Sequence, residues 1–361
     1  MAHVIPGKPT SYFLPNYGRI TTMCALILGI ESSCDETAVA VVEDGRIMRS
    51  NIVSSSEKFH QEYGGIVPEL ASRKQLEYLP AALKAALADA GVVAADIDAV
   101  AVAHGPGLIG SLVVGLVGAK SFAYAHELPL IGVNHLEGHL YANWIRLPED
   151  TRPEPALPAL VLIVSGGHAH MVWMEDHGVY RILGRTRDDA PGEALDKAAR
   201  LLGLGYPGGP AIDNLSREGN AHAVEFPRAL LQGTHDFSFS GVKTSLGHYL
   251  RKTEAGGRAT VADIAASFQE AVMSVLVKKL FAAAEELGPA QVVLAGGVAA
   301  NSRLRSLAEE YAQRSGIPLS LPPRIFCTDN GAMIGAAGYY HYLRHDFAQM
   351  TLDAYASLPL K

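Results

Sequence analysis

The sequence contains few cysteines and few charged residues for its length. Only Cys24, Cys34 and Cys327 occur among its 361 residues, too few and too scattered for a disulfide framework or a zinc ribbon. Charged residues make up 19% of the chain, and 30 Lys and Arg against 37 Asp and Glu give a net charge of −7. Such a chain is not a polycation that coats nucleic acid. Any nucleic-acid site must be a local patch or be shared with a partner.

The sequence also lacks a long hydrophobic run. The segment 107–119 is apolar, but Lys120 follows it after about 13 residues, whereas a membrane span needs ~20. The apolar run 23–30 is short and meets Glu31 without the small-residue cleavage site of a secretory signal. We therefore expect a soluble, cytoplasmic protein that has no membrane partner.

Apolar residues are abundant, at 48% of the chain, and they exclude a disordered protein. A length of 361 residues exceeds what one hydrophobic core usually organises, so we expect two lobes. Residues 1–22 show no periodicity and are interpreted as an N-terminal extension. We assign residues 23–134 to the first lobe and 135–329 to the second, and we expect a C-terminal helix at about 330–348 to pack back on the first.

The predicted elements repeat along the chain. Each half begins with a hairpin and a third strand, at 26–30, 38–42 and 46–54 in the first half and at 160–164, 170–174 and 179–184 in the second. Helices and further strands follow, at 68–90, 99–104, 108–126 and 129–133 in the first half and at 192–202, 261–287, 291–295 and 301–314 in the second. The repeat predicts an internally duplicated α/β protein with two lobes that face a cleft.

Four glycine-rich turns, at 105–110, 165–168, 206–210 and 295–298, follow predicted strands. Glycines at strand ends let backbone N–H groups approach phosphates, and a helix start adds positive potential. Four such turns in two repeated lobes favour a nucleotide cleft over simple tight turns. The first matches GxGxxG, but it follows a hairpin and a helix and lacks the acidic residue of a Rossmann site.

A polar turn, Glu31-Ser32-Ser33-Cys34-Asp35-Glu36-Thr37, joins the first two predicted strands. Its hydroxyl groups suit phosphate oxygens. Either Asp35 or Glu36 has the chemistry to position a cation, a water molecule or a nucleophile.

The segment Asn134-His135-Leu136-Glu137-Gly138-His139 carries a histidine pair. Asn134 and Glu137 have capping-box spacing, which predicts a helix from His135. His135 and His139 are then one turn apart on one face, as two ligands of one metal ion require. Glu137 lies roughly 200° around the helix from His135, so the segment is not the zinc-protease motif H-E-x-x-H.

A metal site needs a third ligand, and Asp329 in Cys327-Thr328-Asp329-Asn330-Gly331 is the best candidate, ahead of a predicted helix at 332–342. Two histidines and one carboxylate leave open coordination positions and suit Fe(II), with Zn(II) or Mn(II) as alternatives. From the histidine pair alone, a metal role and a structural role both stay open.

These motifs together resemble the TsaD/Gcp family of tRNA threonylcarbamoyladenosine transferases. The resemblance runs from about residue 26 to about 345 and is carried, in order, by the segments 29–37, 134–139, 164–168, 189–197, 206–210, 237–241, 296–301 and 327–331. It implies an ASKHA (actin, sugar kinase, Hsp70) fold, an α/β architecture of two duplicated lobes around a nucleotide cleft. Departures are small: Ala169 stands where the family often has Thr, and Pro191 where Ala is common.

The resemblance implies transfer of the threonylcarbamoyl group from threonylcarbamoyl-AMP to N6 of adenosine 37, in tRNAs that read codons beginning with adenine. It implies one Fe²⁺ ion held by His135, His139 and Asp329, with Zn²⁺ as an alternative, and ATP or threonylcarbamoyl-AMP as the nucleotide ligand. The implied adenylate-binding residues are Ile163, Val164, Ser165, Gly166, Gly167, Asp196, Gly209, Asp213 and Asn301. Asp35 and Glu36 are candidates for the base that takes the N6 proton.

The resemblance also implies partners: tRNA, a paralogous TsaB-like subunit, a TsaE-like ATPase and a separate enzyme that supplies threonylcarbamoyl-AMP. The basic residues that could face tRNA are Arg181, Arg185, Arg187, Lys197, Arg200, Lys243, Arg251 and Lys252, and they equally fit a solvated surface.

Three other functions share parts of the pattern. A small-molecule kinase of the same fold accounts for the glycine turns but not for the histidine pair with Asp329. A metalloprotease needs the helix glutamate that is missing beside His135. A non-catalytic, chaperone-like ATPase needs nucleotide but no metal.

Overall fold

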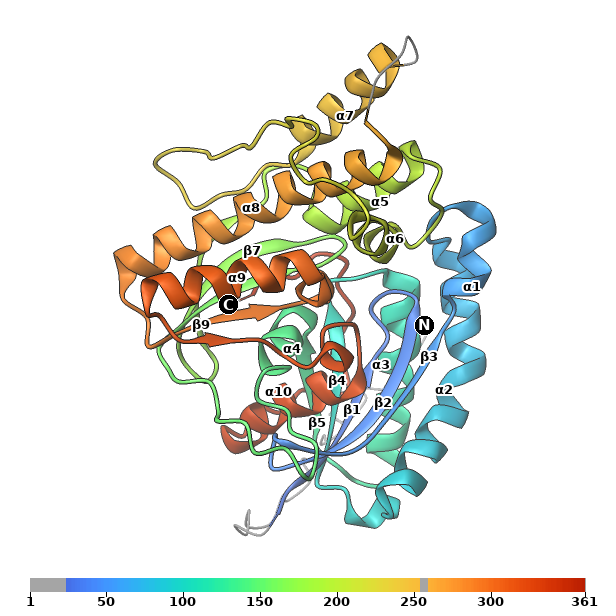
Figure 1. The fold of residues 1–361 in the computed structure, drawn as a ribbon. Helices are drawn as coiled ribbons and strands as arrows, with labels where there is room; N and C mark the ends of the chain where they lie inside the picture. Colours follow the sequence, from blue (N-terminus) through green and yellow to red (C-terminus); the bar gives the residue numbers. More distant parts are fainter. Residues whose placement is uncertain (1–23, 254–258, 361) are drawn as a thin grey trace, which may run out of the picture.

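The computed structural model describes residues 24–253 and 259–360, so the predicted extension at 1–22 lies outside the described residues (Figure 1). One five-stranded sheet, sheet A, has the order β3-β2-β1-β4-β5. Its strands are β1 (Leu26–Glu31), β2 (Glu36–Glu43), β3 (Ile47–Ser55), β4 (Ala99–Gly105) and β5 (Leu130–Asn134). β1 pairs antiparallel with β2 and parallel with β4, so the N-terminal hairpin continues into a parallel half-sheet.

A second five-stranded sheet, sheet B, has the order β10-β9-β6-β7-β8. Its strands are β6 (Ala159–Val164), β7 (Ala169–Asp176), β8 (Val179–Arg185), β9 (Gln291–Ala295) and β10 (Leu319–Ser320). β6 pairs antiparallel with β7 and parallel with β9, as β1 does with β2 and β4. The equivalent pairing confirms the predicted duplication.

The helices form layers on and between the sheets. They are α1 (Glu57–His60), α2 (Pro68–Ala90), α3 (Ile109–Ala125), α4 (His135–Tyr141), α5 (Pro191–Leu201), α6 (Gly208–Ser216), α7 (Ser240–Thr253), α8 (Val261–Leu287), α9 (Ser302–Ser315) and α10 (Gly331–Leu343). α2 and α3 cover the outer face of sheet A, α4 and α10 lie between the sheets, and α8 and α9 cover sheet B (Figure 1). Because each sheet is buried on both faces, its central strands are continuously apolar.

The last helix, α10, packs on β1, β2 and β4 of sheet A. The approach is close enough that a Cβ at Gly29 of β1 would collide with the backbone of Gly331 and Gly335. Glycine is therefore required where the strand and the helix meet. The lobe boundaries at residues 134 and 329 stay a prediction.

Two features differ from the sequence-based expectation. The turn at 206–210 joins α5 to α6 and does not follow a strand, because the chain goes from helix to helix there. The helices α6 and α7 were not predicted, and the first residues of α6, Gly208, Gly209 and Pro210, are typical of a turn. Within the described residues, no helix has both the length and the apolar character needed to cross a membrane.

Candidate functional site

The histidine pair lies on α4, which begins directly where β5 ends. Asn134 caps the helix, because its Oδ1 accepts a hydrogen bond from the Leu136 N–H at 2.9 Å. The predicted helix start at His135 is therefore confirmed. The predicted capping box is wrong, because the Glu137 carboxylate does not turn back to Asn134 but accepts a hydrogen bond from Tyr180 on another element.

His135, His139 and Asp329 come together in the layer between the two sheets. Oδ1 of Asp329 lies 3.3 Å from Nε2 of His139 and 3.8 Å from Nε2 of His135. One potential ligand atom from each residue lies within 4.8 Å of the others. Asp329 reaches the histidines because it immediately precedes α10, which packs beside α4.

The other nitrogen of His135 is held by the polar turn. Nδ1 lies 3.0 Å from Oε2 of Glu31 and 3.1 Å from Oγ of Ser33. Burial opposes protonation of His135, but the Glu31 and Asp329 carboxylates outweigh it and raise the pKa to about 9. With Nδ1 engaged by Glu31, the ring presents Nε2 toward Asp329, which is how carboxylates orient metal-binding histidines.

The environment of His139 and Asp329 fits a cation. Neither ring nitrogen of the buried His139 makes a hydrogen bond of regular geometry among the described residues. Burial would raise the pKa of Asp329, yet His135 and His139 lower it to about 2, so the group is ionised. Buried polar atoms are normally satisfied. Two imidazoles with a free nitrogen and one carboxylate are a donor set that a divalent transition metal fits.

A side chain of α2 binds the backbone of the polar turn at 31–37. The Gln75 amide donates to the carbonyl oxygens of Ser32, Cys34 and Glu36, at 3.3, 3.0 and 3.0 Å. The amide has two hydrogens, which the three carbonyl oxygens share, so one side chain ties together the backbone at three positions of the turn. The turn therefore presents its acidic residues from a rigid support.

The structure places Glu36 near Asp329, with Asp35 next to Glu36 in the polar turn. Asp35 is buried, and its carbonyl accepts a bond from Ser56 Oγ at 2.9 Å. Burial and the nearby Asp329 and Asp35 carboxylates raise the pKa of Glu36 well above its usual range. A carboxyl with a raised pKa holds a proton more readily than an ordinary one.

The loop after β6 faces open space. Gly166 and Gly167 are exposed, and a Cβ at either would meet no atom within 4 Å. Ser165 O accepts a hydrogen bond from the Gly192 N–H at 3.2 Å, which ties the loop to the start of α5. Ile163 and Val164 point into the hydrophobic cores on the two faces of sheet B, so only their backbone can reach a ligand.

Three of the predicted adenylate-binding side chains hold helix starts. Asp196 Oδ1 accepts from the first two N–H groups of α6, the second being Gly209 at 3.3 Å. Asp213 accepts from the Ser302 hydroxyl at 2.6 Å, and Asn301 caps α9. A Cβ at Gly209 would meet no atom within 4 Å. These contacts link the start of α6 to α5 and the start of α9 to α6, and the start of α5 is itself tied to the glycine loop.

Several contacts of the site were not predicted from the sequence. Glu31 was noted only as part of a polar turn, and its contact with His135 links β1 to α4. Burial, together with nearby His135, lowers the pKa of His168 to about 4, so it is a neutral imidazole next to the metal-type group. Burial and the Asp35 carboxylate raise the pKa of Tyr206, which places the 206–210 turn near the polar turn. No local signal in the sequence indicates these long-range contacts.

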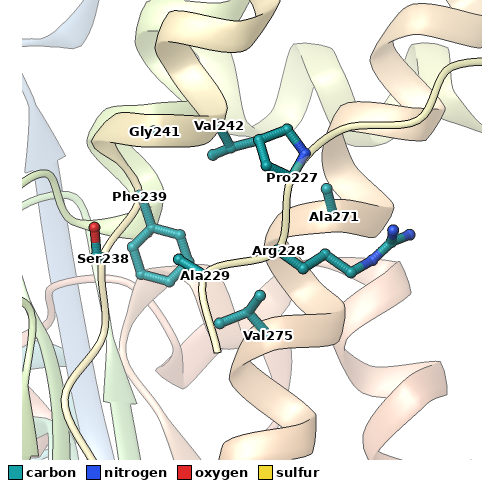
Figure 2. A pocket seen from close by; sticks show the side chains of 9 residues that line it. All are labelled: Pro227, Arg228, Ala229, Ser238, Phe239, Gly241, Val242, Ala271 and Val275. Carbon is teal, nitrogen blue, oxygen red and sulfur yellow. The ribbon is translucent and has the colours of Figure 1, made fainter. Parts of the chain in front are cut away.

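A cavity of about 100 Å³ lies elsewhere, between α7, α8 and the loop that precedes α7. Its lining residues are Pro227, Arg228, Ala229, Ser238, Phe239, Gly241, Val242, Ala271 and Val275 (Figure 2). It touches the 237–241 segment, but none of the residues predicted for the metal or the adenylate lines it.

Solved structures share the fold. HypF of T. kodakarensis superposes with a TM-score of 0.57 at 15% identity, over 89% of this chain and 48% of that chain. Component A of the Acidaminococcus fermentans (R)-2-hydroxyglutaryl-CoA dehydratase superposes with a TM-score of 0.50 at 15% identity, over 89% of this chain and 99% of that chain. Together with the two duplicated sheets, these likenesses show an ASKHA-type fold.

Sequence comparison is more specific. The family model for TsaD, tRNA N6-adenosine threonylcarbamoyltransferase, matches residues 48–336. Proteins of that name from Desulfitobacterium hafniense and Moorella thermoacetica are each 53% identical over 336 residues, 92% of this chain and 97% of theirs. One from Thermomicrobium roseum is 51% identical over 356 residues, 93% of this chain and 97% of its own. The chain therefore belongs to the TsaD family of tRNA N6-adenosine threonylcarbamoyltransferases, the enzymes that form threonylcarbamoyladenosine (t6A) in tRNA.

Proposed function

We propose that this enzyme forms t6A with one metal ion, iron, held by His135, His139 and Asp329. The donor is threonylcarbamoyl-AMP, bound in the cleft rimmed by the loop after β6 and the starts of α6 and α9. The acceptor is N6 of adenosine 37 in tRNAs that read codons beginning with adenine. The observation that supports the proposal most is the buried group of two histidines and an aspartate beside an open glycine loop.

When bound, a metal ion with open coordination positions supplies electrophilic polarisation of a carbonyl or phosphoryl oxygen. The chain's own residues prepare for this by fixing donor atoms. Glu31 holds Nδ1 of His135, so the ring cannot turn its Nε2 away from Asp329. Zn²⁺ fits the same donor set, and the choice of iron rests on the family resemblance.

The glycine loop binds the leaving AMP in this proposal. Backbone N–H groups at Gly166 and Gly167 are free of Cβ hindrance, and the helix starts at α5, α6 and α9 add positive potential on the same rim. Such donors stabilise the charge that develops on the phosphate as the carbonyl–oxygen bond breaks.

In this proposal, a carboxylate of the polar turn accepts the N6 proton. Glu36 has the raised pKa that suits a proton acceptor, and Asp35 next to it is the alternative. Both stand on a turn that Gln75 holds rigid, beside Asp329.

We propose that the enzyme works with a TsaB-like subunit, a TsaE-like ATPase and a separate threonylcarbamoyl-AMP synthase, as the family resemblance implies. An exposed apolar stripe on α3 supports a docking subunit. Ile109, Val113 and Val117 lie four residues apart on one helix face and are 46%, 40% and 56% exposed, and Leu76 on the adjoining α2 is 68% exposed. Contiguous exposed apolar side chains of this kind mark interaction surfaces.

Three of the eight basic residues predicted to face tRNA have acidic partners in the structure. Lys197 and Lys243 both pair with Asp189, and Arg187 pairs with Asp236. These partners cancel part of the basic patch predicted from the sequence. We therefore propose that the remaining arginines and a partner subunit share the tRNA phosphates.

The test is reconstitution with tRNA, the partner proteins, threonine, bicarbonate and ATP, followed by mass spectrometry of tRNA nucleosides. We expect t6A from the wild type. We expect neither t6A nor bound metal from His139→Ala, while His126→Ala, an exposed histidine at the end of α3, keeps both. Full t6A formation by a metal-free His139→Ala protein would refute the metal proposal.

The metalloprotease alternative finds no support in the geometry. Glu137, the only carboxylate on α4, accepts hydrogen bonds on the face opposite His135 and His139. It is therefore not placed to activate a metal-bound water for peptide cleavage.

A further inference from the structure

Glu137 is a buried carboxylate that two different parts of the molecule hold. Its exposed fraction is 4%. Tyr180 donates its hydroxyl hydrogen to Oε1 at 2.9 Å, and Nε2 of His341 lies 2.9 Å from Oε2. Tyr180 stands on β8 of sheet B, whereas His341 stands in the last turn of α10. Sheet B and α10 therefore meet at one side chain of the histidine helix.

The neighbouring residue, Gly138, marks the point where α4 crosses α10. A Cβ at Gly138 would lie 2.8 Å from Cδ1 of Ile334 and 3.2 Å from Cγ of Met333, both on α10. A larger residue would push the helices apart. Glu137 and His139 thus flank a tight contact between the two helices.

The two helices are joined on both sides of this crossing. On one side, His139 faces Asp329, which precedes the first turn of α10. On the other, Glu137 faces His341 in the last turn. A rotation of α4 about its axis would lengthen one of these contacts, so the pair fixes the direction in which the histidines point.

The Glu137 carboxylate also favours the charged form of His341. Burial disfavours protonation of His341, yet Glu137 and Asp346 outweigh it and raise its pKa. A buried carboxylate that loses its partners pays a desolvation cost, so α4 is expected to shift when the contacts are removed.

We propose that Glu137 is a positioning residue for the metal site: held by Tyr180 and His341, it fixes the rotation of α4 so that His135 and His139 converge on Asp329. The inference rests on the proposed metal site. Glu137 itself touches neither metal nor substrate in this role. Its effect passes through the two histidines that flank it on the helix.

The test measures Co²⁺ binding to the metal-free full-length protein. Titration gives the affinity, and the visible absorption spectrum reports the geometry of the ligands. We expect Glu137→Ala to weaken Co²⁺ binding by about 10-fold or more and to alter the spectrum. Tyr180→Phe should weaken binding several-fold, since it removes one of the two contacts that hold the Glu137 carboxylate. Glu137→Gln, which keeps an acceptor for Tyr180, should restore most of the affinity.

Two controls separate positioning from loss of stability. Tyr342→Phe removes the hydroxyl from a buried tyrosine on α10 whose ring packs against Phe347 and which, among the described residues, makes no hydrogen bond to Glu137. Leu116→Ala opens a cavity in the core between sheet A and α3, away from α4. We expect both to keep wild-type Co²⁺ affinity and spectrum, although Leu116→Ala lowers the melting temperature.

Wild-type Co²⁺ affinity and spectrum in Glu137→Ala would overturn the inference and leave the metal site standing. Absence of binding by the wild type would overturn the inference and the metal proposal together. An equal loss of affinity in Leu116→Ala would also overturn it, since stability alone would then explain the effect. If Glu137→Ala does not fold, Tyr180→Phe against Tyr342→Phe decides by the same criteria.

Discussion

Nε2 of His139 lies 3.3 Å from Oδ1 of Asp329, although one residue stands on α4 and the other just ahead of α10. The contact exists because the two helices pack side by side between the sheets and cross at Gly138. The packing of these two helices therefore brings His135, His139 and Asp329 together. Changes in that packing should alter metal binding as well as stability.

Replacing Glu31 by Gln should weaken metal binding by about 10- to 100-fold. The variant keeps the shape of the side chain but removes the negative charge that holds Nδ1 of His135. A chelator competition with Fe²⁺ under anaerobic conditions measures the effect. Glu77→Gln, on the exposed side of α2, is the matched control and should leave the affinity unchanged. Equal affinities for the two variants would contradict the role of Glu31.

Replacing Gly29 by Ala should destabilise the protein by about 3 kcal/mol or more, because the new methyl group meets the backbone of α10, which cannot move aside easily. Urea unfolding of the metal-free protein measures this loss. Gly241→Ala is the control, since a Cβ there meets nothing within 4 Å and alanine favours the helix α7. Similar unfolding midpoints for both variants would show that α10 does not pack on β1 this closely.

The metal-free protein should lose stability as the pH rises above neutrality, and Glu137→Gln should lose less. Glu137 and Asp346 raise the pKa of His341 against the opposing effects of burial and Arg344. A histidine whose pKa is raised by folding stabilises the folded protein fully at pH values below its unfolded-state pKa of about 6.5. This contribution is lost as the pH rises through the folded-state pKa. Unfolding free energies at pH 6 to 9 test the trend, and NMR titration of His341 tests its origin. A His341 pKa that is the same in the wild type and in Glu137→Gln would refute the explanation.

Replacing Val113 or Val117 by Asp should weaken association with the TsaB-like subunit by about 10-fold or more, because a charge would then enter an apolar contact. Isothermal titration calorimetry with the purified subunit measures the affinity. Val179→Asp, at an equally exposed position on β8, is the control. Unchanged affinity in both α3 variants would place the partner on another surface.

Local patterns in the sequence determined most of the secondary structure. α2 at Pro68–Ala90 and α8 at Val261–Leu287 begin and end where the sequence predicted, because proline, a capping threonine and terminal glycines mark their ends. The hairpins and the repeat were also visible, since buried strands are short apolar runs between polar turns. α6 was missed because its glycine-rich start has the composition of a loop.

The sequence by itself determined the family, the duplicated fold and the identity of His135, His139 and Asp329 as a candidate group, since spacing and motif order are local properties. Only the tertiary structure decided that Glu31 holds His135 and that Glu137 turns away from Asn134 to meet Tyr180 and His341. Those partners lie far apart in the chain, and each contact depends on how the sheets and α10 pack around α4. Long-range packing leaves no local pattern in the sequence, so the orientation of the site could be found only in three dimensions.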